Sequence, residues 1–182
     1  MTPTSLQTDD VSLMFEAARS YIAGAKIIIA SDGIEEDGAI KQPTLPVIVC
    51  CAIAIEILLK AILNINEIPR PKGDGHDLNQ LFLSLPIDKQ CELLEYQSKF
   101  TEKTVDQAKI AIFKARNVFK TWRYAYEHET LEIGPDFLLH FSLALSEYIK
   151  SKSELNRSEN GWKIISGITD LTPRVIERHK DI

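Results

Sequence analysis

Apolar residues recur at alternating steps of three and four along most of the chain, which places them on one face of an α-helix. The pattern predicts six helices, at about 9–31, 45–64, 78–82, 86–100, 105–128 and 135–152. No segment of any length alternates apolar and polar residues as a strand does. We therefore predict an all-α protein: an antiparallel helical bundle of five to six helices at 9–152. The remaining residues, 153–182, form a short irregular extension that docks on the bundle or on a dimer mate.

The segment 45–64 is apolar on every side until Glu56 and Lys60. A helix without a polar face belongs in the centre of a bundle. Its most apolar stretch, 45–55, is too short to span a bilayer, and no secretory signal is present. We expect a cytoplasmic protein that does not bind a membrane.

The outer helices have one predicted buried face each. The face of the first helix comprises Leu13, Met14, Ala17, Ala18, Tyr21 and Ala25, and that of the last helix comprises Phe137, Leu138, Phe141, Leu145, Tyr148 and Ile149. Thr8, Asp9 or Asp10 is a suitable cap for the first helix, Asp77 or Asp74 for the short third one, and Thr101 or Thr104 for the fifth.

Composition narrows the classes of function. The net charge of −5 argues against sequence-independent adhesion to nucleic acid over the whole surface, but it allows a local basic groove. The three cysteines are odd in number and lie in helical patterns, which favours buried free thiols in a reducing compartment. No spacing of cysteine and histidine indicates zinc, so we expect no metal and no cofactor.

The predicted long helix at 105–128 carries the densest chemistry. Arg116, Lys120 and Arg123 lie at i, i+4 and i+7, so they form a basic stripe beside the apolar seam. The stripe leads to Trp122–His128, where an arginine, a histidine, two tyrosines and a glutamate come together. Any chemistry that this protein performs is expected there.

Glu56 interrupts a buried helix, so its carboxylate must be paired or neutralised. One interpretation is an i,i+4 pair with Lys60 at the surface. The other is an inward Glu56 that pairs with a cation of a facing helix, for which Arg123 is the best candidate, because its planar group can engage both carboxylate oxygens.

Arg123 and His128 share their spacing with Arg174 and His179, and Arg70–His76 is similar, so the spacing alone is weakly specific. Only Arg123–His128 closes a long amphipathic helix. An ideal helix would turn the two side chains about 140° apart, so they converge only if His128 lies at or beyond the helix end. His76 is expected to pack or hydrogen-bond at the start of the short helix.

The order of these features resembles the HEPN family (higher eukaryote and prokaryote nucleotide-binding domains). The matching pieces are Phe15-x-x-Ala18-x-x-Tyr21, Ile55-Glu56-x-Leu58-Leu59-Lys60-x-x-Leu63, Gly75-His76-Asp77-Leu78-x-x-Leu81, the segment Trp122–His128 and a closing helix. The likeness covers about residues 10–150.

The resemblance implies a metal-independent RNA endonuclease of the toxin or defence type. Two Arg-x4-His motifs would meet across a homodimer, His128 acting as acid or base and Arg123 holding the phosphate. Glu56, Tyr124, Tyr126 and Glu127 would support this site, and Arg116 and Lys120 would bind the RNA backbone. An antitoxin or another protein would be a further partner.

One departure from the family favours an alternative. Active members commonly have a small polar residue directly after the arginine, whereas this chain has Tyr124, and Glu127 and Glu129 flank His128. On the alternative interpretation Arg123 is locked to Glu56 and His128 is incidental. The protein is then a catalytically inactive HEPN module for dimerisation and for partner or nucleotide binding.

Overall fold

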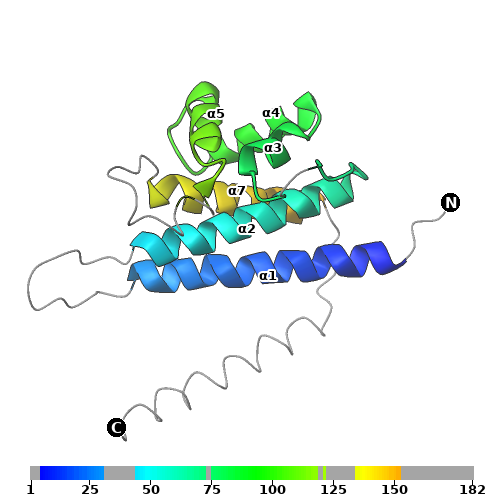
Figure 1. Ribbon diagram of the computed structural model, residues 1–182, viewed down its shortest axis with the longest axis horizontal. Coiled ribbons are helices and arrows are strands. Elements are labelled where there is room, and N and C mark those ends of the chain that lie inside the picture. Colours follow the sequence, from blue (N-terminus) through cyan, green and yellow to red (C-terminus); the bar gives the residue numbers. More distant parts are fainter. Residues whose placement is uncertain (1–4, 31–43, 73–74, 119–120, 122–133, 153–182) are drawn as a thin grey trace, which may run out of the picture. The chain divides into compact units, whose positions relative to one another are not determined.

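The computed structural model describes residues 5–30, 44–72, 75–118, 121 and 134–152, and the statements below concern these residues. They form an all-α bundle, as predicted (Figure 1). Its helices are α1 (Ser5–Ala30), α2 (Thr44–Ile65), α3 (Leu78–Leu83), α4 (Ile87–Ser98), α5 (Val105–Lys114) and α7 (Pro135–Lys152). The chain divides into the units Met1–Lys152 and Ser153–Ile182, and the second unit lies outside the described residues.

Helix α2 is the centre of the bundle. It packs along α1 and α7 and also contacts α3 (Figure 1). Its largest fully buried side chains are Ile48, Ile55, Leu58, Leu59, Ile62 and Leu63. Burial on several sides removes the need for a polar face, which confirms the central position predicted for this helix.

The length of α2 corrects one expectation. At 22 residues, with a mean hydropathy of 2.4 over its most apolar 18 residues, it is long and apolar enough to cross a membrane, although 56% of those 18 residues are buried inside the protein. The expectation that the apolar segment is too short to span a bilayer therefore does not hold for the whole helix, whose bounds agree with the predicted 45–64 to within one residue. Packing against α1 and α7 accounts for the same composition, because a core helix is apolar on all sides.

Helix α1 differs from its prediction at both its start and its buried face. It begins at Ser5, upstream of the predicted caps. Among its residues 11–30 the buried side chains are Val11, Phe15, Ala18, Ile22 and Ala25, whereas Leu13, Ala17 and Tyr21 of the predicted face are exposed. This helix has two apolar faces, and its contact with α2 determines which of them is buried.

The caps of the short helices are local and follow the prediction. Asp77 is the N-cap of α3, and its carboxylate oxygen accepts a hydrogen bond of 2.8 Å from the backbone N–H of Gln80. Thr104 and Gln107 form a reciprocal capping box at the start of α5. Each cap satisfies backbone donors that the first turn of a helix leaves without partners.

The predicted continuous helix at 105–128 is wrong in the described part. Helix α5 ends at Lys114, and residues 115–117 form a turn before helical structure resumes at Val118. The carbonyl oxygen of Arg116 accepts a hydrogen bond of 3.1 Å from the backbone N–H of Leu78, at the start of α3. Arg116, the first residue of the predicted basic stripe, therefore lies in a turn and not in a regular helix.

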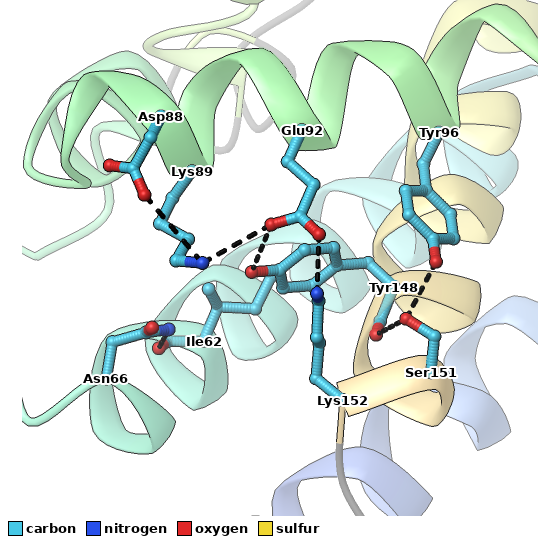
Figure 2. Close-up of polar contacts among 9 residues, drawn as sticks. All are labelled: Ile62, Asn66, Asp88, Lys89, Glu92, Tyr96, Tyr148, Ser151 and Lys152. Atoms are coloured by element: carbon cyan, nitrogen blue, oxygen red, sulfur yellow. Dashed lines mark hydrogen bonds and ion pairs between the residues drawn. The ribbon is translucent and has the colours of Figure 1, made fainter.

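A polar cluster joins α4 to the end of α7 (Figure 2). The carboxylate of Glu92 accepts hydrogen bonds from Lys152 at 2.6 Å, Lys89 at 3.4 Å and Tyr148 at 3.5 Å. Beside them the Tyr96 hydroxyl donates to Ser151 Oγ at 2.8 Å. Burial raises the pKa of Tyr148 to about 12, with the Glu92 charge adding to the effect, so this hydroxyl remains a donor.

The predicted buried face of α7 agrees with the structure, whereas the expectation for the cysteines is only partly correct. The six residues predicted to face the core from α7 are all buried. The cysteines are free thiols, and burial raises the pKa of Cys51 to about 12. Cys50, however, is only half-buried on α2 and Cys91 is exposed on α4, which corrects the expectation that all three are buried.

Candidate functional site

The carboxylate of Glu56 joins two of the motifs noted in the sequence. Its Oε1 accepts a hydrogen bond of 2.6 Å from Lys60 Nζ, one turn later on α2. Its Oε2 lies 2.9 Å from His76 Nδ1, which belongs to the Gly-His-Asp-Leu segment before α3. The Glu56 and Lys60 side chains are only 13% and 18% exposed, whereas that of His76 is 44% exposed. The carboxylate and the ammonium group of this cluster are therefore largely buried, and its imidazole is accessible to solvent.

Local backbone structure places His76 at this point. Gly75 has a φ of +67°, a conformation that residues with a Cβ atom rarely adopt. Asp77, on the other side of His76, is fixed as the N-cap of α3. A Cβ atom added at Gly75 would lie 3.6 Å from Lys60 Nζ, so the segment passes directly over the lysine. The glycine and the cap together direct the imidazole towards Glu56.

The arrangement can hold and orient a proton. A carboxylate that accepts from Nδ1 of an imidazole fixes the orientation of the ring, as in many acid–base sites. Lys60 supplies a second positive group within hydrogen-bonding distance of the same carboxylate. The contact between Glu56 and His76 is an ion pair when the imidazole is protonated and a neutral–charged hydrogen bond otherwise.

The two interpretations of Glu56 are resolved in part. The pair with Lys60 exists, although it is largely buried and does not lie at the surface. His76 is the second partner of Glu56, whereas the sequence predicted only that His76 packs or hydrogen-bonds at the start of the short helix and named Arg123 as the distant cation. The available signal was the glycine before His76 and the cap after it, which together predict a sharply turned loop at a helix start.

The residues expected to perform catalysis lie outside the described part of the chain. These are Arg123 and His128, and the same holds for the predicted supporting residues Tyr124, Tyr126 and Glu127 and for the predicted RNA-binding residue Lys120. Within the described residues, the structure brings together Glu56, Lys60 and His76. The site at 122–128 stays a prediction.

Arg116, the other predicted RNA-binding residue, lies in the turn after α5, and its side chain folds back onto the end of that helix. Its guanidinium lies over the ring of Phe113, 4.1 Å from the ring centroid, and donates a hydrogen bond of 3.0 Å to the Phe113 carbonyl. Phe113 itself is exposed. An exposed aromatic ring beside an arginine and Lys109, one turn earlier, is a surface that suits both stacking and phosphate contacts.

An open cavity of about 280 Å³ lies between α5 and the start of α7. Apolar atoms of Ile110, Ala111 and Phe137 contribute to its wall, and Lys103, Gln107 and Lys114 are among its polar lining residues. Gly134 completes the lining. A small site with an apolar wall and two ammonium groups suits a flat apolar group that carries negative charge.

Comparisons with known proteins do not extend this description. No family model matches the chain, and neither a curated protein nor a solved structure shows a significant similarity to it.

Proposed function

We propose that the protein is a metal-independent RNA endonuclease of the HEPN type, which acts in the cytoplasm as a homodimer with a composite Arg-x4-His site. The proposal assigns a toxin or defence role, with an antitoxin or another protein as its partner. Arg123 and His128 are the catalytic pair in this proposal, and Arg116 and Lys120 bind the RNA.

The observation that carries the proposal is the contact between Glu56 and His76. It joins the Ile-Glu-x-Leu-Leu-Lys segment to the Gly-His-Asp-Leu segment, two of the sequence pieces on which the HEPN resemblance rests. Both pieces lie in an all-α bundle with the central helix carrying the glutamate. The exposed Phe113–Arg116 pair adds support, because it offers RNA a stacking surface and a cation.

The proposed reaction needs only proton transfer and charge stabilisation. A base removes the proton of an RNA 2′-hydroxyl, and this oxygen attacks the adjacent phosphorus. The bond to the 5′-oxygen breaks, and an acid returns a proton to the leaving oxygen. The products are a 2′,3′-cyclic phosphate and a 5′-hydroxyl. His128 exchanges protons in this scheme, and Arg123 stabilises the charge that develops on the phosphate.

Incubation of the purified full-length chain with end-labelled RNA in EDTA tests the proposal. We expect cleavage that leaves 2′,3′-cyclic phosphate ends and is lost in Arg123→Ala and in His128→Ala. A substrate with 2′-deoxyribose at the cut position should resist cleavage, because its attacking group is missing.

The tail provides a matched control. Arg174 and His179 have the same spacing as Arg123 and His128, but the proposal gives them no role in catalysis. Arg174→Ala and His179→Ala should therefore retain activity. His76→Gln tests whether His76 also exchanges protons in the reaction, because glutamine cannot carry the positive charge of a protonated imidazole. Cleavage that survives both Arg123→Ala and His128→Ala would overturn the assignment of these residues.

The cavity at α5 favours a second candidate, a HEPN-like module that binds a nucleotide without cleaving RNA. Its apolar wall suits a base, and Lys103 and Lys114 suit phosphates. Both oxygens of Glu56 already have partners, which is what a purely structural role for this carboxylate requires.

Calorimetric titration with AMP and ATP tests the second candidate. Binding should weaken in Lys103→Ala through loss of charge, and it should disappear in Ala111→Phe, which fills the cavity and leaves every charge in place. A titration with no heat for either nucleotide, or binding unaffected by Ala111→Phe, would exclude this cavity as the site.

A further inference from the structure

The solvent side of α5 carries apolar side chains where a surface helix is ordinarily polar. Ala108 and Ile112 are buried in the bundle, and Ile110 lies two positions from each of them. Two positions turn a helix by about 200°, so Ile110 is at the centre of the side away from the core. Ile110 is 56% exposed, and Phe113 on the same side is 52% exposed. Two neighbouring apolar side chains of this size on the surface indicate an interaction site more strongly than a single one does.

The cavity between α5 and the start of α7 opens beside Ile110, which is one of its lining residues. Ala111 and Phe137 continue the apolar wall. Phe137 stacks on Phe141, with the ring centroids 5.6 Å apart, so the core holds this part of the wall in place. A cavity of about 150 Å³ is sufficient to hold a benzene ring. This cavity of about 280 Å³ therefore accommodates one aromatic or leucine side chain.

The surroundings of the cavity are basic, in contrast to the protein as a whole. Residues 102–116 contain four basic and two acidic side chains, a local charge of +2, whereas the whole chain has a net charge of −5. Lys103 and Lys114 line the cavity, and none of its described lining residues is acidic. Arg116 lies over the ring of Phe113 and adds a third cation at the edge. We refer to the cavity, Ile110, Phe113 and these three cations as the outer face of α5.

We infer that the outer face of α5 docks a short acidic segment of another protein. An aromatic or leucine side chain of this segment fills the cavity, and its carboxylates pair with Lys103 and Lys114. An apolar anchor in a pocket with charged contacts at the rim is the usual arrangement of a protein interface. Ile110 contacts an apolar side chain well but offers an RNA base no ring on which to stack, which favours a peptide over RNA in the cavity. The peptide is also an alternative occupant to the nucleotide considered above.

The inference names the chemistry of the partner in the proposed function, and one consequence rests on that function. The nuclease proposal assigns Arg116 to the RNA backbone, and the same side chain belongs to the outer face of α5. A bound acidic segment places carboxylates where RNA places phosphates. We therefore expect the partner to compete with RNA and to inhibit cleavage.

Two phage-displayed peptide libraries, panned on the immobilised full-length chain, test the docking. Both carry random apolar residues at the same positions, and the positions between them hold glutamate in one library and lysine in the other. We expect enrichment from the glutamate library alone, with an aromatic residue or leucine common to the selected peptides. Equal enrichment from both libraries, or none from either, rules the inference out.

Fluorescence anisotropy with a selected peptide locates the contact. Ala111→Phe fills the cavity and leaves every charge in place, and Ile110→Glu adds a like charge at an exposed position. Each should weaken binding at least about tenfold, whereas the melting temperature of Ile110→Glu should stay close to that of the wild type. Ile87→Glu is the matched control, because Ile87 is 67% exposed on α4 and lies outside the face, so binding should be unchanged. Wild-type affinity in both Ala111→Phe and Ile110→Glu would exclude this face as the docking site.

The selected peptide is then added to the RNA cleavage assay. Inhibition that excess RNA relieves supports competition, and binding without inhibition contradicts it. If the chain does not cleave RNA, the anisotropy measurement still decides the docking, so the two proposals fail separately. If no peptide is selected and single-stranded RNA or ATP binds with the same sensitivity to Ala111→Phe, the face is a nucleic-acid or nucleotide site and the inference is wrong.

Discussion

Replacement of Glu56 by leucine tests whether its carboxylate is a structural centre of the bundle. The substitution removes the hydrogen bonds to Lys60 and His76 and leaves the Lys60 ammonium largely buried without its partner. Loss of one member of a buried pair costs about 3–5 kcal/mol, whereas an exposed pair contributes about 0.2–1 kcal/mol. The intermediate burial of this cluster gives an expected loss of about 3 kcal/mol at neutral pH.

The assay is urea denaturation at pH 7, with the free energy of unfolding extrapolated to water. The double variant Glu56→Leu with Lys60→Met removes both charges of the pair, and it should recover most of the lost stability, since an apolar pair can replace a buried ion pair. The double-mutant cycle isolates the coupling energy between the two side chains.

The Glu147–Lys150 pair on α7 is the control. Both of its side chains are about half exposed, so Glu147→Leu should change stability by less than about 0.5 kcal/mol. If Glu56→Leu costs no more than this control, the carboxylate behaves as a surface group. The interpretation of Glu56 as a buried organising residue would then be refuted.

Three further substitutions, one of them with a matched control, give distinct outcomes in thermal or urea unfolding. Gln97 is buried, and its side-chain amide has no hydrogen-bond partner in the described part of the chain, so Gln97→Met should stabilise the protein by about 1–2 kcal/mol; a loss of stability would reveal a partner. Gly75→Ala should cost about 1–2 kcal/mol, because φ is positive there, whereas Gly134→Ala should not incur this cost. The hydrogen bond from Lys152 lowers the pKa of Glu92 below its ordinary 4.5, so the stability that this pair contributes is present above pH 4.5 and is lost as pH falls through the lowered value. Glu92→Gln should therefore be less stable than the wild type at pH 7, and the difference should shrink as pH falls below 4.5; a difference that does not change with pH would contradict this assignment.

Features that depend on neighbours in the sequence could be predicted from the sequence. The central position of α2 follows from its lack of a polar face, and the buried face of α7 follows from its periodicity. The caps at Asp77 and Thr104 depend on hydrogen bonds to residues three positions away. Each of these features is decided within one or two turns of helix, where side-chain chemistry and spacing are sufficient.

Features that depend on distant segments were decided only by the tertiary structure. The contact between Glu56 and His76 joins residues twenty positions apart through a glycine turn, and the break after Lys114 accompanies a hydrogen bond from Leu78 to Arg116. Helix α1 has two apolar faces of similar character, and packing on α2 chose the one that contains Phe15. Periodicity detects that a face is apolar, but it carries no information about which partner will cover it.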